Sequence, residues 1–331
     1  MQCAGEASDG SPVRDAGTLP HVTSVPAVPV VDDPSAAERP TWSVMIPVHN
    51  CAGFLEPALG EVVAPLGDRA DVEIVVVDDM STDDPEDVVE RVGGGIVRYV
   101  ALPEAHGAIR NFNACVNLTR GRFVHLHHGD DGILPGFYAA MEEALASGEA
   151  AAAVCRTRYV DDRGTPTVTT RSECSPSGWW RDAIPTLAVS NRVRPTGIVV
   201  TRETYEAIGG YRTDLPHAAD WDMWMRVAAH GPVWFVDEVL SLYREHDGSD
   251  TADRIRTGEN IRERIEAIDI VAASTPPEIR SKARRRALAY AAVYAARTGA
   301  QRLRRRDLRA AVAQWRAAFA CLWAVPARGA A

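Results

Sequence analysis

Short apolar runs alternate with amphipathic segments along the first half of the chain. The run over 42–49 ends in polar residues, as a buried strand of a parallel sheet does. A periodic apolar segment over about 54–66 predicts a helix, and 72–79 predicts a second buried strand. The alternation continues with a helix over 84–92, a strand over 96–102, a helix over 107–119 and a strand over 122–127. We therefore expect right-handed β-α-β units and a mostly parallel sheet with helices on both faces.

The pattern is less regular beyond residue 135. The predicted elements are a helix over 136–147, a strand over 151–160, a strand over 197–201, helices over 202–208 and 220–229, and a strand over 234–242. The Gly-, Pro-, Thr- and Ser-rich stretch up to residue 178 predicts a hairpin or a flexible loop. Residues 1–40 show no period and predict a disordered leader, whereas the Ala- and Arg-rich segment over 255–331 predicts a helical extension.

Polar residues follow three of the predicted strands at the point where each strand ends. These residues are His49 and Asn50, Asp78 and Asp79, and Asp130 and Asp131. Because parallel strands end at one edge of a sheet, where open α/β sheets bind their ligands, we expect these side chains to line one cleft. A single acidic strand end is common, whereas three that converge indicate a binding site.

The sequence Gly129-Asp130-Asp131 offers two adjacent carboxylates in a loop. Carboxylate oxygens are good ligands for Mg²⁺ or Mn²⁺, so a divalent metal site is one interpretation. An ordinary turn is the other, because Gly-Asp-Asp is also favourable turn chemistry. The segment over 78–83 also has two interpretations. It provides an acid that binds a ligand, or it caps the next helix.

Asp220 opens a predicted helix, where its carboxylate can project into a cleft as a general base. The alternative is that Asp220 only compensates the dipole at the start of this helix. Further along, Arg244 and His246 offer a cation and a metal-binding imidazole, although a lone histidine is by default packed or exposed.

Charge and cysteine content narrow the class of protein. The formal net charge of −9 argues against a nucleic-acid partner, since binding to phosphates needs a basic surface. The 6 cysteines form no Cys-x-x-Cys pair, which gives no support to a zinc ribbon and suits a reducing cytoplasm. The amino-terminal residues lack the pattern of a signal peptide, and no uncharged apolar run is long enough to span a bilayer. The sequence therefore favours a cytoplasmic protein.

Six segments of the sequence follow one another in a specific order and at a specific spacing. They are 43–50, 75–83, 121–131, 209–212, 220–226 and 240–246. Together they resemble glycosyltransferase family 2, a group of inverting enzymes on the GT-A fold, and the resemblance covers roughly residues 41–250. It implies a GT-A domain with a Rossmann-like, nucleotide-sugar-binding half over 41–135 and an acceptor and catalytic half over 136–250.

The resemblance also implies an activity and a site. A sugar would pass from a nucleotide-sugar donor, linked to UDP or dTDP, to a hydroxyl of a carbohydrate, lipid-linked or small-molecule acceptor, with inversion. Asp130 and Asp131 would bind a divalent metal, Mn²⁺ or Mg²⁺, and Asp220 would be the general base. His246 would be a late metal or phosphate contact. The implied nucleotide-binding residues are Pro47, His49, Asn50, Asp78, Asp79, Arg110 and Asn113.

Two positions depart from the family pattern. His128 stands two residues before Asp130, where the family often has an acid, and because an imidazole can also ligate Mn²⁺ we include His128 in the predicted metal site. Ala219 precedes Asp220 where a glutamate is common, so Asp220 is the acid that remains as the base.

Other functions fit the sequence less well. A catalytically silent sugar-nucleotide-binding or scaffold protein of a polysaccharide pathway would share these segments, but the presence of Asp130 and Asp220 favours an enzyme. A nucleotidyltransferase would need a glycine-rich loop with a Lys or Arg after the first strand, and Pro47–Asn50 offers none. A dinucleotide-dependent oxidoreductase would need GxGxxG after a strand, which is also missing.

Apolar residues recur at helical spacing over 308–325, behind the arginine-rich segment over 302–306. One interpretation is an interfacial helix that makes peripheral contact with the inner face of an anionic membrane, near a lipid-linked acceptor. The other is that the apolar stripe packs against the catalytic domain or a partner chain.

Overall fold

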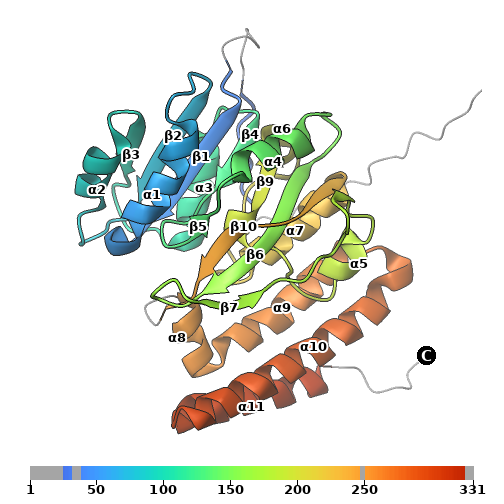
Figure 1. The fold of residues 1–331 in the computed structure, drawn as a ribbon. Helices are drawn as coiled ribbons and strands as arrows, with labels where there is room; N and C mark the ends of the chain where they lie inside the picture. Colours follow the sequence, from blue (N-terminus) through green and yellow to red (C-terminus); the bar gives the residue numbers. More distant parts are fainter. Residues whose placement is uncertain (1–24, 32–38, 247–249, 325–331) are drawn as a thin grey trace, which may run out of the picture.

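The computed structural model describes residues 25–31, 39–246 and 250–324. A mixed ten-stranded sheet forms the centre of this part of the chain, with the strand order β3-β2-β1-β4-β9-β6-β10-β5 (Figure 1). β7 pairs with β6, and β8 pairs with β10. The strands are β1 Trp42–Val48, β2 Val72–Asp78, β3 Val97–Ala101, β4 Phe123–Leu126, β5 Gly132–Ile133, β6 Ala152–Val160, β7 Pro166–Thr169, β8 Gly178–Trp179, β9 Ile198–Thr201 and β10 Val233–Arg244.

β1 to β4 form a parallel half-sheet. β1 pairs with β2 from Trp42↔Val72 to Val48↔Asp78, and with β4 on its other side, while β3 pairs with β2. Every residue of β1 is buried, which explains why this strand is apolar throughout instead of alternating. The carboxyl ends of β1, β2 and β4 lie at one edge, so the polar strand ends expected from the sequence are neighbours.

The second half of the sheet is mixed. β9 is antiparallel to both β4 and β6, whereas β10 is parallel to β6. β7 returns antiparallel to β6, because a short connection can join only antiparallel neighbours, and the hairpin expected before residue 178 is present. The mostly parallel order predicted from the sequence thus describes β1 to β4, and β9 joins this half to β6 and β10.

Helices cover both faces of the sheet. α1 Ala52–Leu66, α2 Pro85–Gly93 and α4 Phe137–Leu145 bury their apolar side chains on one face. α3 Ala108–Leu118, α5 Ala183–Leu187, α6 Arg202–Ile208 and α7 Ala219–His230 cover the other face, and the short 3₁₀ turn η1 Pro195–Gly197 leads into β9. The result is the layered α/β architecture expected from the alternating pattern.

Residues 25–31 lie against α6 and the turn that follows it. Val28 is buried, the carbonyl of Pro26 accepts a hydrogen bond from the Gly210 N–H (2.8 Å), and the carbonyl of Pro29 accepts one from Arg202 (2.5 Å). The predicted disorder is therefore wrong for these residues, because an extended segment held through its carbonyls leaves no periodic pattern. Residues 1–24 and 32–38 of the predicted leader lie outside the described part of the chain.

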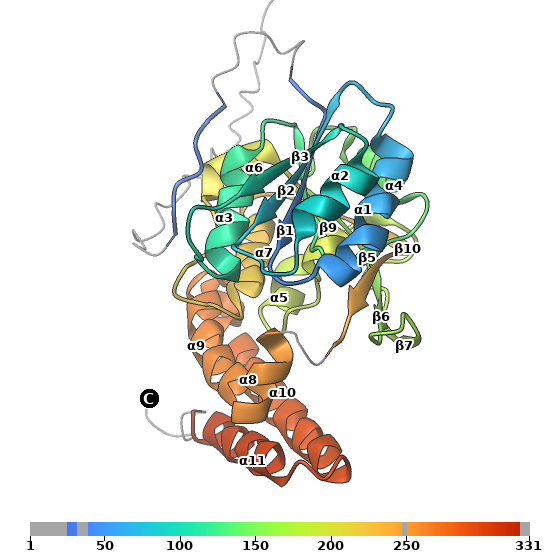
Figure 2. The same ribbon diagram turned by 90° about the vertical axis from the view of Figure 1, so that its left-hand side faces the viewer.

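In the described part of the chain four helices follow the sheet, as the Ala- and Arg-rich composition predicts. They are α8 Asp250–Thr257, α9 Glu259–Ala273, α10 Pro277–Arg304 and α11 Leu308–Trp323. α9 buries Ile261, Ile268 and Val271 in the same apolar cluster as α7, and α10 and α11 lie side by side beyond it (Figure 2). Among the helices in the described ranges, none is long and apolar enough to cross a bilayer.

Candidate active site

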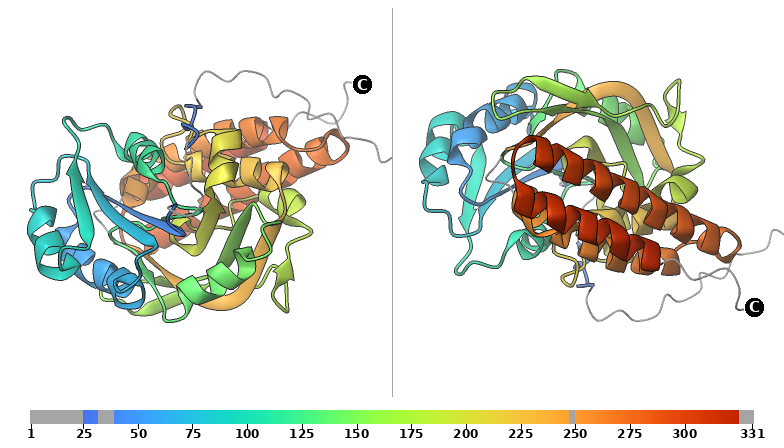
Figure 3. Two further views of the ribbon diagram at one scale, coloured as in Figure 1. Left: turned by 90° about the horizontal axis from the view of Figure 1, so that it is seen from above. Right: turned by 90° about the horizontal axis from the view of Figure 1, so that it is seen from below.

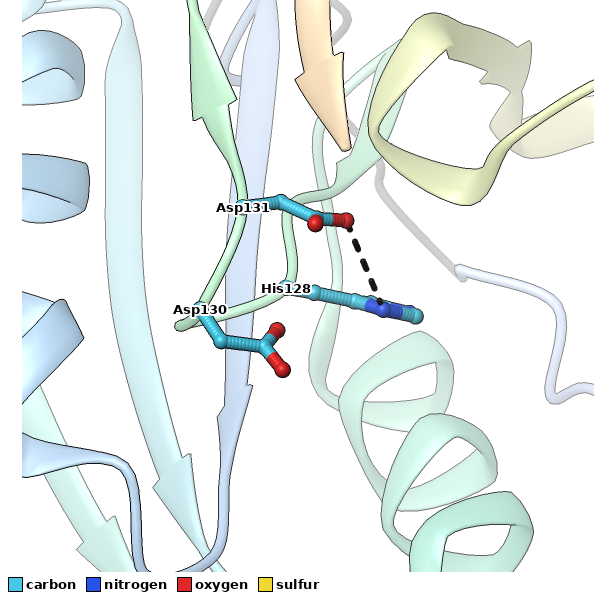
Figure 4. Close-up of side chains that lie close together, drawn as sticks. All are labelled: His128, Asp130 and Asp131. Carbon is cyan, nitrogen blue, oxygen red and sulfur yellow. Dashed lines mark ion pairs between the residues drawn. The ribbon is translucent and has the colours of Figure 1, made fainter. Parts of the chain in front are cut away.

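His128, Asp130 and Asp131 form a compact cluster in the loop between β4 and β5. Their side chains project to the same side of the loop (Figure 4), and one ligand atom of each lies within 4.8 Å of the others. Gly129 allows this shape, because a Cβ there would lie 2.7 Å from Cγ1 of Val48. The Gly-Asp-Asp sequence is therefore a tight turn that also gathers an imidazole and two carboxylates.

Asp131 is the deeper of the two acids. Its carboxylate accepts hydrogen bonds from the Arg244 backbone N–H (2.9 Å) and from the Thr196 hydroxyl (2.8 Å). Burial, and then the neighbouring charge of Asp130, hold the pKa of Asp131 well above its usual range. Asp131 thus fixes the loop to β10 and η1, and its oxygens keep lone pairs for another partner.

Asp130 faces the solvent more than Asp131, with 31% of its side chain exposed. His246 Nε2 lies 3.1 Å from its Oδ2, and Arg244 Nε donates a hydrogen bond to its backbone carbonyl (3.0 Å). Burial raises the pKa of Asp130, but the hydrogen bond from His246 and the charges of His128 and His246 outweigh it and lower the pKa. The lowered pKa keeps the Asp130 carboxylate ionised, which favours binding of a cation.

His128 is the third member of this cluster. Its ring stacks on Phe112 of α3, with 4.8 Å between the ring centroids, and its Nδ1 lies 3.9 Å from Asp131 Oδ2. Its Nε2 is buried without a hydrogen-bond partner among the described residues, and burial lowers the pKa of the imidazole. A neutral ring with a free nitrogen beside two carboxylates fits the donor set of a divalent cation.

Asp220, the predicted base, lies within electrostatic range of His128 in this cluster. It is the second residue of α7, and its Oδ2 accepts a hydrogen bond from the side chain of Asn191 (2.7 Å). Asp130 and Asp220 both act electrostatically on His128, raising its pKa against the effect of burial. The charges of both acids therefore converge on one imidazole, so Asp130 and Asp220 both lie within electrostatic range of His128.

The segment that joins the two sets of acids escaped the sequence analysis. Asn191 holds Asp220, and five residues later Thr196 holds Asp131. Between them, Arg194 lies over the rings of Tyr159 and Tyr243, with its guanidinium carbon 5.4 and 5.2 Å from the ring centroids. In the sequence, only a run of polar side chains directly before a buried strand indicates this segment.

The predicted nucleotide-binding residues separate into exposed and buried groups. His49, Asn50 and Arg110 are exposed, at the end of β1 and in the first turn of α3. Asn50 has a positive φ of 52°, and its side-chain oxygen accepts a hydrogen bond from the Thr82 N–H (2.8 Å), which fixes the loop after β2. His49 Nδ1 donates to the carbonyl of Asp79 (2.8 Å). These contacts build an exposed rim at the ends of β1 and β2.

The buried carboxylates of Asp78 and Asp79 accept hydrogen bonds from other residues of the protein. Asp78 accepts hydrogen bonds from Ser81 and from the hydroxyl of Tyr99 (2.8 Å). Asp79 accepts the backbone N–H groups of His106 (2.7 Å) and Gly107 (2.8 Å), directly before α3. These hydrogen bonds hold the two loops beside the strand ends.

Pro47 and Asn113 are also buried. Pro47 lies in β1 beyond Met45, the last residue paired with β4, where its missing N–H breaks no bond to that strand. The amide of Asn113 exchanges two hydrogen bonds with the backbone of Tyr211, at 2.9 and 2.7 Å. Both of its polar atoms are thus used to join α3 to the turn before α7.

Cys51 lies near acids from the ends of both β2 and β4. Its side chain is close to Gly129, and burial together with the charges of Asp130, Asp83 and Asp78 raises the pKa of its thiol to about 12. Asp130 and Asp78 therefore lie within electrostatic range of one side chain. The strand-end acids converge on one region, as parallel topology requires.

Glu263 of α9 was not expected at the site. This buried carboxylate accepts the backbone N–H groups of His217 and Ala218 (2.8 Å for Ala218), which directly precede α7. It also lies 3.3 Å from Arg254 of α8. Because backbone N–H groups at a helix start favour a negative partner, Glu263 fixes the position from which Asp220 projects.

Trp179 and Trp180 lie near the carboxyl end of α7. They line a hollow of about 430 Å³ together with Ala228 and Ala229, at the carboxyl end of α7. Asp220 is at the amino end of this helix, roughly 12 Å away at 1.5 Å per residue. The two tryptophans therefore lie towards the opposite end of α7 from Asp220.

Known proteins and one protein family are similar to this chain in sequence. The sequence model described as Glycosyl transferase family 2 matches residues 43–203. An uncharacterized protein of Mycobacterium tuberculosis is 28% identical over 261 residues, which are 74% of this chain and 80% of that protein. A chondroitin synthase of Pasteurella multocida is 22% identical over 218 residues, which are 61% of this chain but only 20% of that longer protein.

Solved structures show the same fold. The structure of S. aureus TarS 1-349 in complex with UDP-GlcNAc is similar with a TM-score of 0.64 and 16% identity, covering 86% of this chain and 82% of that one. The mannosyltransferase PcManGT of Pyrobaculum calidifontis, in complex with GDP-Man and Mn²⁺, has a TM-score of 0.55 and 19% identity, covering 90% of each chain. These likenesses show a GT-A-like fold, and the sequence model that matches residues 43–203 identifies the chain as a family 2 glycosyltransferase.

Proposed function

We propose that this glycosyltransferase uses a donor linked to UDP or dTDP and transfers the sugar to an acceptor hydroxyl with inversion. The observation that carries the proposal is the convergence of Asp130, Asp131 and Asp220 on His128. A charged leaving group and a hydroxyl nucleophile need a cation site and a base on opposite sides of one reacting carbon. The cluster in the β4–β5 loop and the start of α7 supply these two groups.

We infer that Asp130, Asp131 and His128 hold a divalent cation. Bound there, the cation would neutralise the charge that develops on the departing diphosphate. An imidazole in the ligand set favours Mn²⁺ over Mg²⁺, which prefers oxygen ligands alone. His246 approaches Asp130 through Nε2, so in this arrangement it orients the carboxylate instead of adding a ligand.

Asp220 is the base in this proposal. As the acceptor oxygen attacks the anomeric carbon, the bond from that carbon to the diphosphate oxygen breaks and the acceptor proton passes to Asp220. Asn191 occupies Oδ2 of Asp220, and Oδ1 accepts the backbone N–H of Trp221 (2.7 Å). The carboxylate is thereby oriented, and a single displacement inverts the configuration.

The exposed rim binds the nucleotide in this proposal. His49 and Asn50 would contact the base, and Arg110, at the start of α3, would face the diphosphate. Asp78 and Asp79 keep the adjoining loops in place, and any direct contact with uracil or ribose would use lone pairs that remain on their carboxylates. Asn113 and Pro47 are buried and would support the nucleotide-binding rim from the interior of the protein.

The acceptor carries a hydroxyl on a carbohydrate, a lipid-linked molecule or a small molecule. We place the reaction in the cytoplasm, because the described cysteines Cys51, Cys115, Cys155, Cys174 and Cys321 are all free thiols.

The test is a thermal-shift panel of nucleoside diphosphates and their sugars, with and without Mn²⁺. We expect UDP or dTDP and the matching sugar nucleotide to raise the melting temperature only when Mn²⁺ is present. Asp130→Ala should lose this shift, whereas Asp162→Ala, which removes an exposed acid from the β6–β7 connection, should keep it. An equal shift without metal would contradict the metal role, and an NMR spectrum showing a product with the donor's anomeric configuration would contradict inversion.

A further inference from the structure

α11 has two opposite faces of different character. The face that packs on the other carboxyl-terminal helices buries small or polar side chains, namely Ala310, Ala311, Gln314, Ala317 and Cys321. The large apolar residues Leu308, Val312, Phe319, Leu322 and Trp323 are exposed instead, with Phe319 at 66% and Trp323 at 86%. Their spacing places them on one side of the helix. The expectation that this stripe packs against the catalytic domain is therefore wrong.

The exposed side of α11 faces away from the sheet. Seen from below, α10 and α11 lie in front of the rest of the molecule, so no described element covers the outer face of α11 (Figure 3, right). A contiguous set of large apolar side chains in water is unfavourable and marks a surface that binds something. α11 keeps its place without these side chains, because Gln314 donates hydrogen bonds to Ile255 (2.7 Å) and Asn260 (2.8 Å) on the buried side.

Charge distinguishes between the partners that could cover this face. Residues 277–324 contain 12 Lys and Arg against 2 acids, although the whole chain has a net charge of −9. Arg309 and Arg316 border a shallow hollow of about 390 Å³ beside Leu308 and Val312. A second copy of the chain would bring identical arginines to the same contact and repel them, whereas a surface of acidic headgroups over an apolar layer complements both features.

We propose that the outer face of α11 binds an anionic phospholipid surface. Phe319, Leu322 and Trp323 enter the boundary between headgroups and acyl chains, and Arg309 and Arg316 bind phosphates. Tryptophan is suited to this depth because its ring is apolar and its N–H is polar. The carboxyl end of β10, where Arg244 contacts Asp131, is directed towards the side of α8–α11 (Figures 1 and 2), so a bound membrane would lie on the side of the catalytic edge.

The test is co-sedimentation of the full chain with vesicles of phosphatidylcholine alone or mixed with phosphatidylglycerol. We expect binding to the mixed vesicles that weakens with salt, and little binding to the neutral ones. The double variant Phe319→Glu/Trp323→Glu should bind at least about tenfold more weakly, since two aromatic side chains are no longer buried. Arg309→Glu/Arg316→Glu should lose the preference for anionic vesicles. Val168→Glu, at an exposed apolar residue of β7, is the matched control and should bind like the wild type.

Three results would overturn the proposal. They are wild-type protein that stays in the supernatant with anionic vesicles, equal sedimentation of the Phe319/Trp323 variant, or sedimentation velocity that shows a dimer dissociated by this variant. The last result would assign the face to self-association. Because the substituted side chains are exposed, all variants should melt like the wild type and keep the Mn²⁺-dependent shift with nucleotide. Lipid binding and sugar transfer can therefore fail independently.

Discussion

Asn191 and Asp220 are 29 residues apart in the sequence and are joined by a hydrogen bond of 2.7 Å from Nδ2 to Oδ2. The contact ties the start of α7 to the segment that also holds Asp131 through Thr196. Asp131 and Asp220 are thus positioned relative to each other by six consecutive residues, 191–196, in addition to the sheet.

Replacement of Asp220 by Asn should remove the base while preserving shape. Turnover is expected to fall by about 10²–10⁴-fold, the range for loss of general-base catalysis, and donor binding should be retained. Steady-state kinetics and the donor-dependent thermal shift measure the two effects separately. Near-normal turnover in this variant would place the base at another residue.

Asn191→Ala leaves Asp220 present but without its side-chain partner. We expect kcat to fall by about tenfold, because a misplaced catalytic group loses much of the advantage of orientation, while KM for the donor stays near the wild-type value. Asn117→Ala, at an exposed asparagine near the end of α3, is the matched control. If both variants behaved alike, Asn191 would have no role in orienting the base.

His128→Asp should change the preferred metal. The substitution gives a ligand set of carboxylates alone, which suits Mg²⁺ better than the present set with its imidazole. We expect the ratio of Mg²⁺- to Mn²⁺-supported turnover to rise by about tenfold, one decade being 1.4 kcal/mol of relative affinity. Metal titrations of the wild type and the variant give this ratio. An unchanged ratio would remove His128 from the ligand set.

The convergence of acids was predictable from sequence, whereas their partners were not. Parallel strands end at one edge whatever their loops do, so the alternation of elements sufficed to bring Asp78 near Asp130. The bonds of Asp79 to His106 and Gly107 depend on the path of a loop, and those of Asn191 and Thr196 depend on β9 lying antiparallel between β4 and β6. Neither feature produces a period in the sequence. In α11 the apolar spacing correctly predicted a helix, but the alanines on its other side, which are small enough for close packing, determine the buried face.

Asp71 should contribute to the loss of stability in acid. The hydrogen bond from Arg69 holds its pKa below the usual range of an aspartate, so the ionised form favours the folded state. This stability is present above the unfolded-state pKa of about 3.9 and is lost as the pH falls below it. The free energy of unfolding, measured in urea at pH 5 and pH 3, should therefore change less in Asp71→Asn than in the wild type. Asp68→Asn, at an exposed neighbour, should follow the wild type, and identical profiles for both variants would contradict the role of Asp71.

Glu263→Ala should leave two backbone N–H groups before α7 without their acceptor. We expect a loss of about 1–3 kcal/mol in the free energy of unfolding, the usual effect of an unpaired buried donor, together with reduced turnover. Glu263→Gln keeps an acceptor oxygen and should recover most of the activity. Equal defects in the two variants would point to the ion pair with Arg254 instead of the contact with α7.

The contact of Glu263 with the start of α7 also determines where the chain can be shortened. An end after β10, at the boundary that the change of composition near residue 255 suggests, would remove α9 and uncover the apolar residues of α7 against which Ile261 and Ile268 pack. An end between α9 and α10 would keep that layer, but it would remove the exposed apolar face of α11 and uncover the side of α9 that packs on α10. A fragment that stops there should still hold the start of α7 through the hydrogen bonds to Glu263.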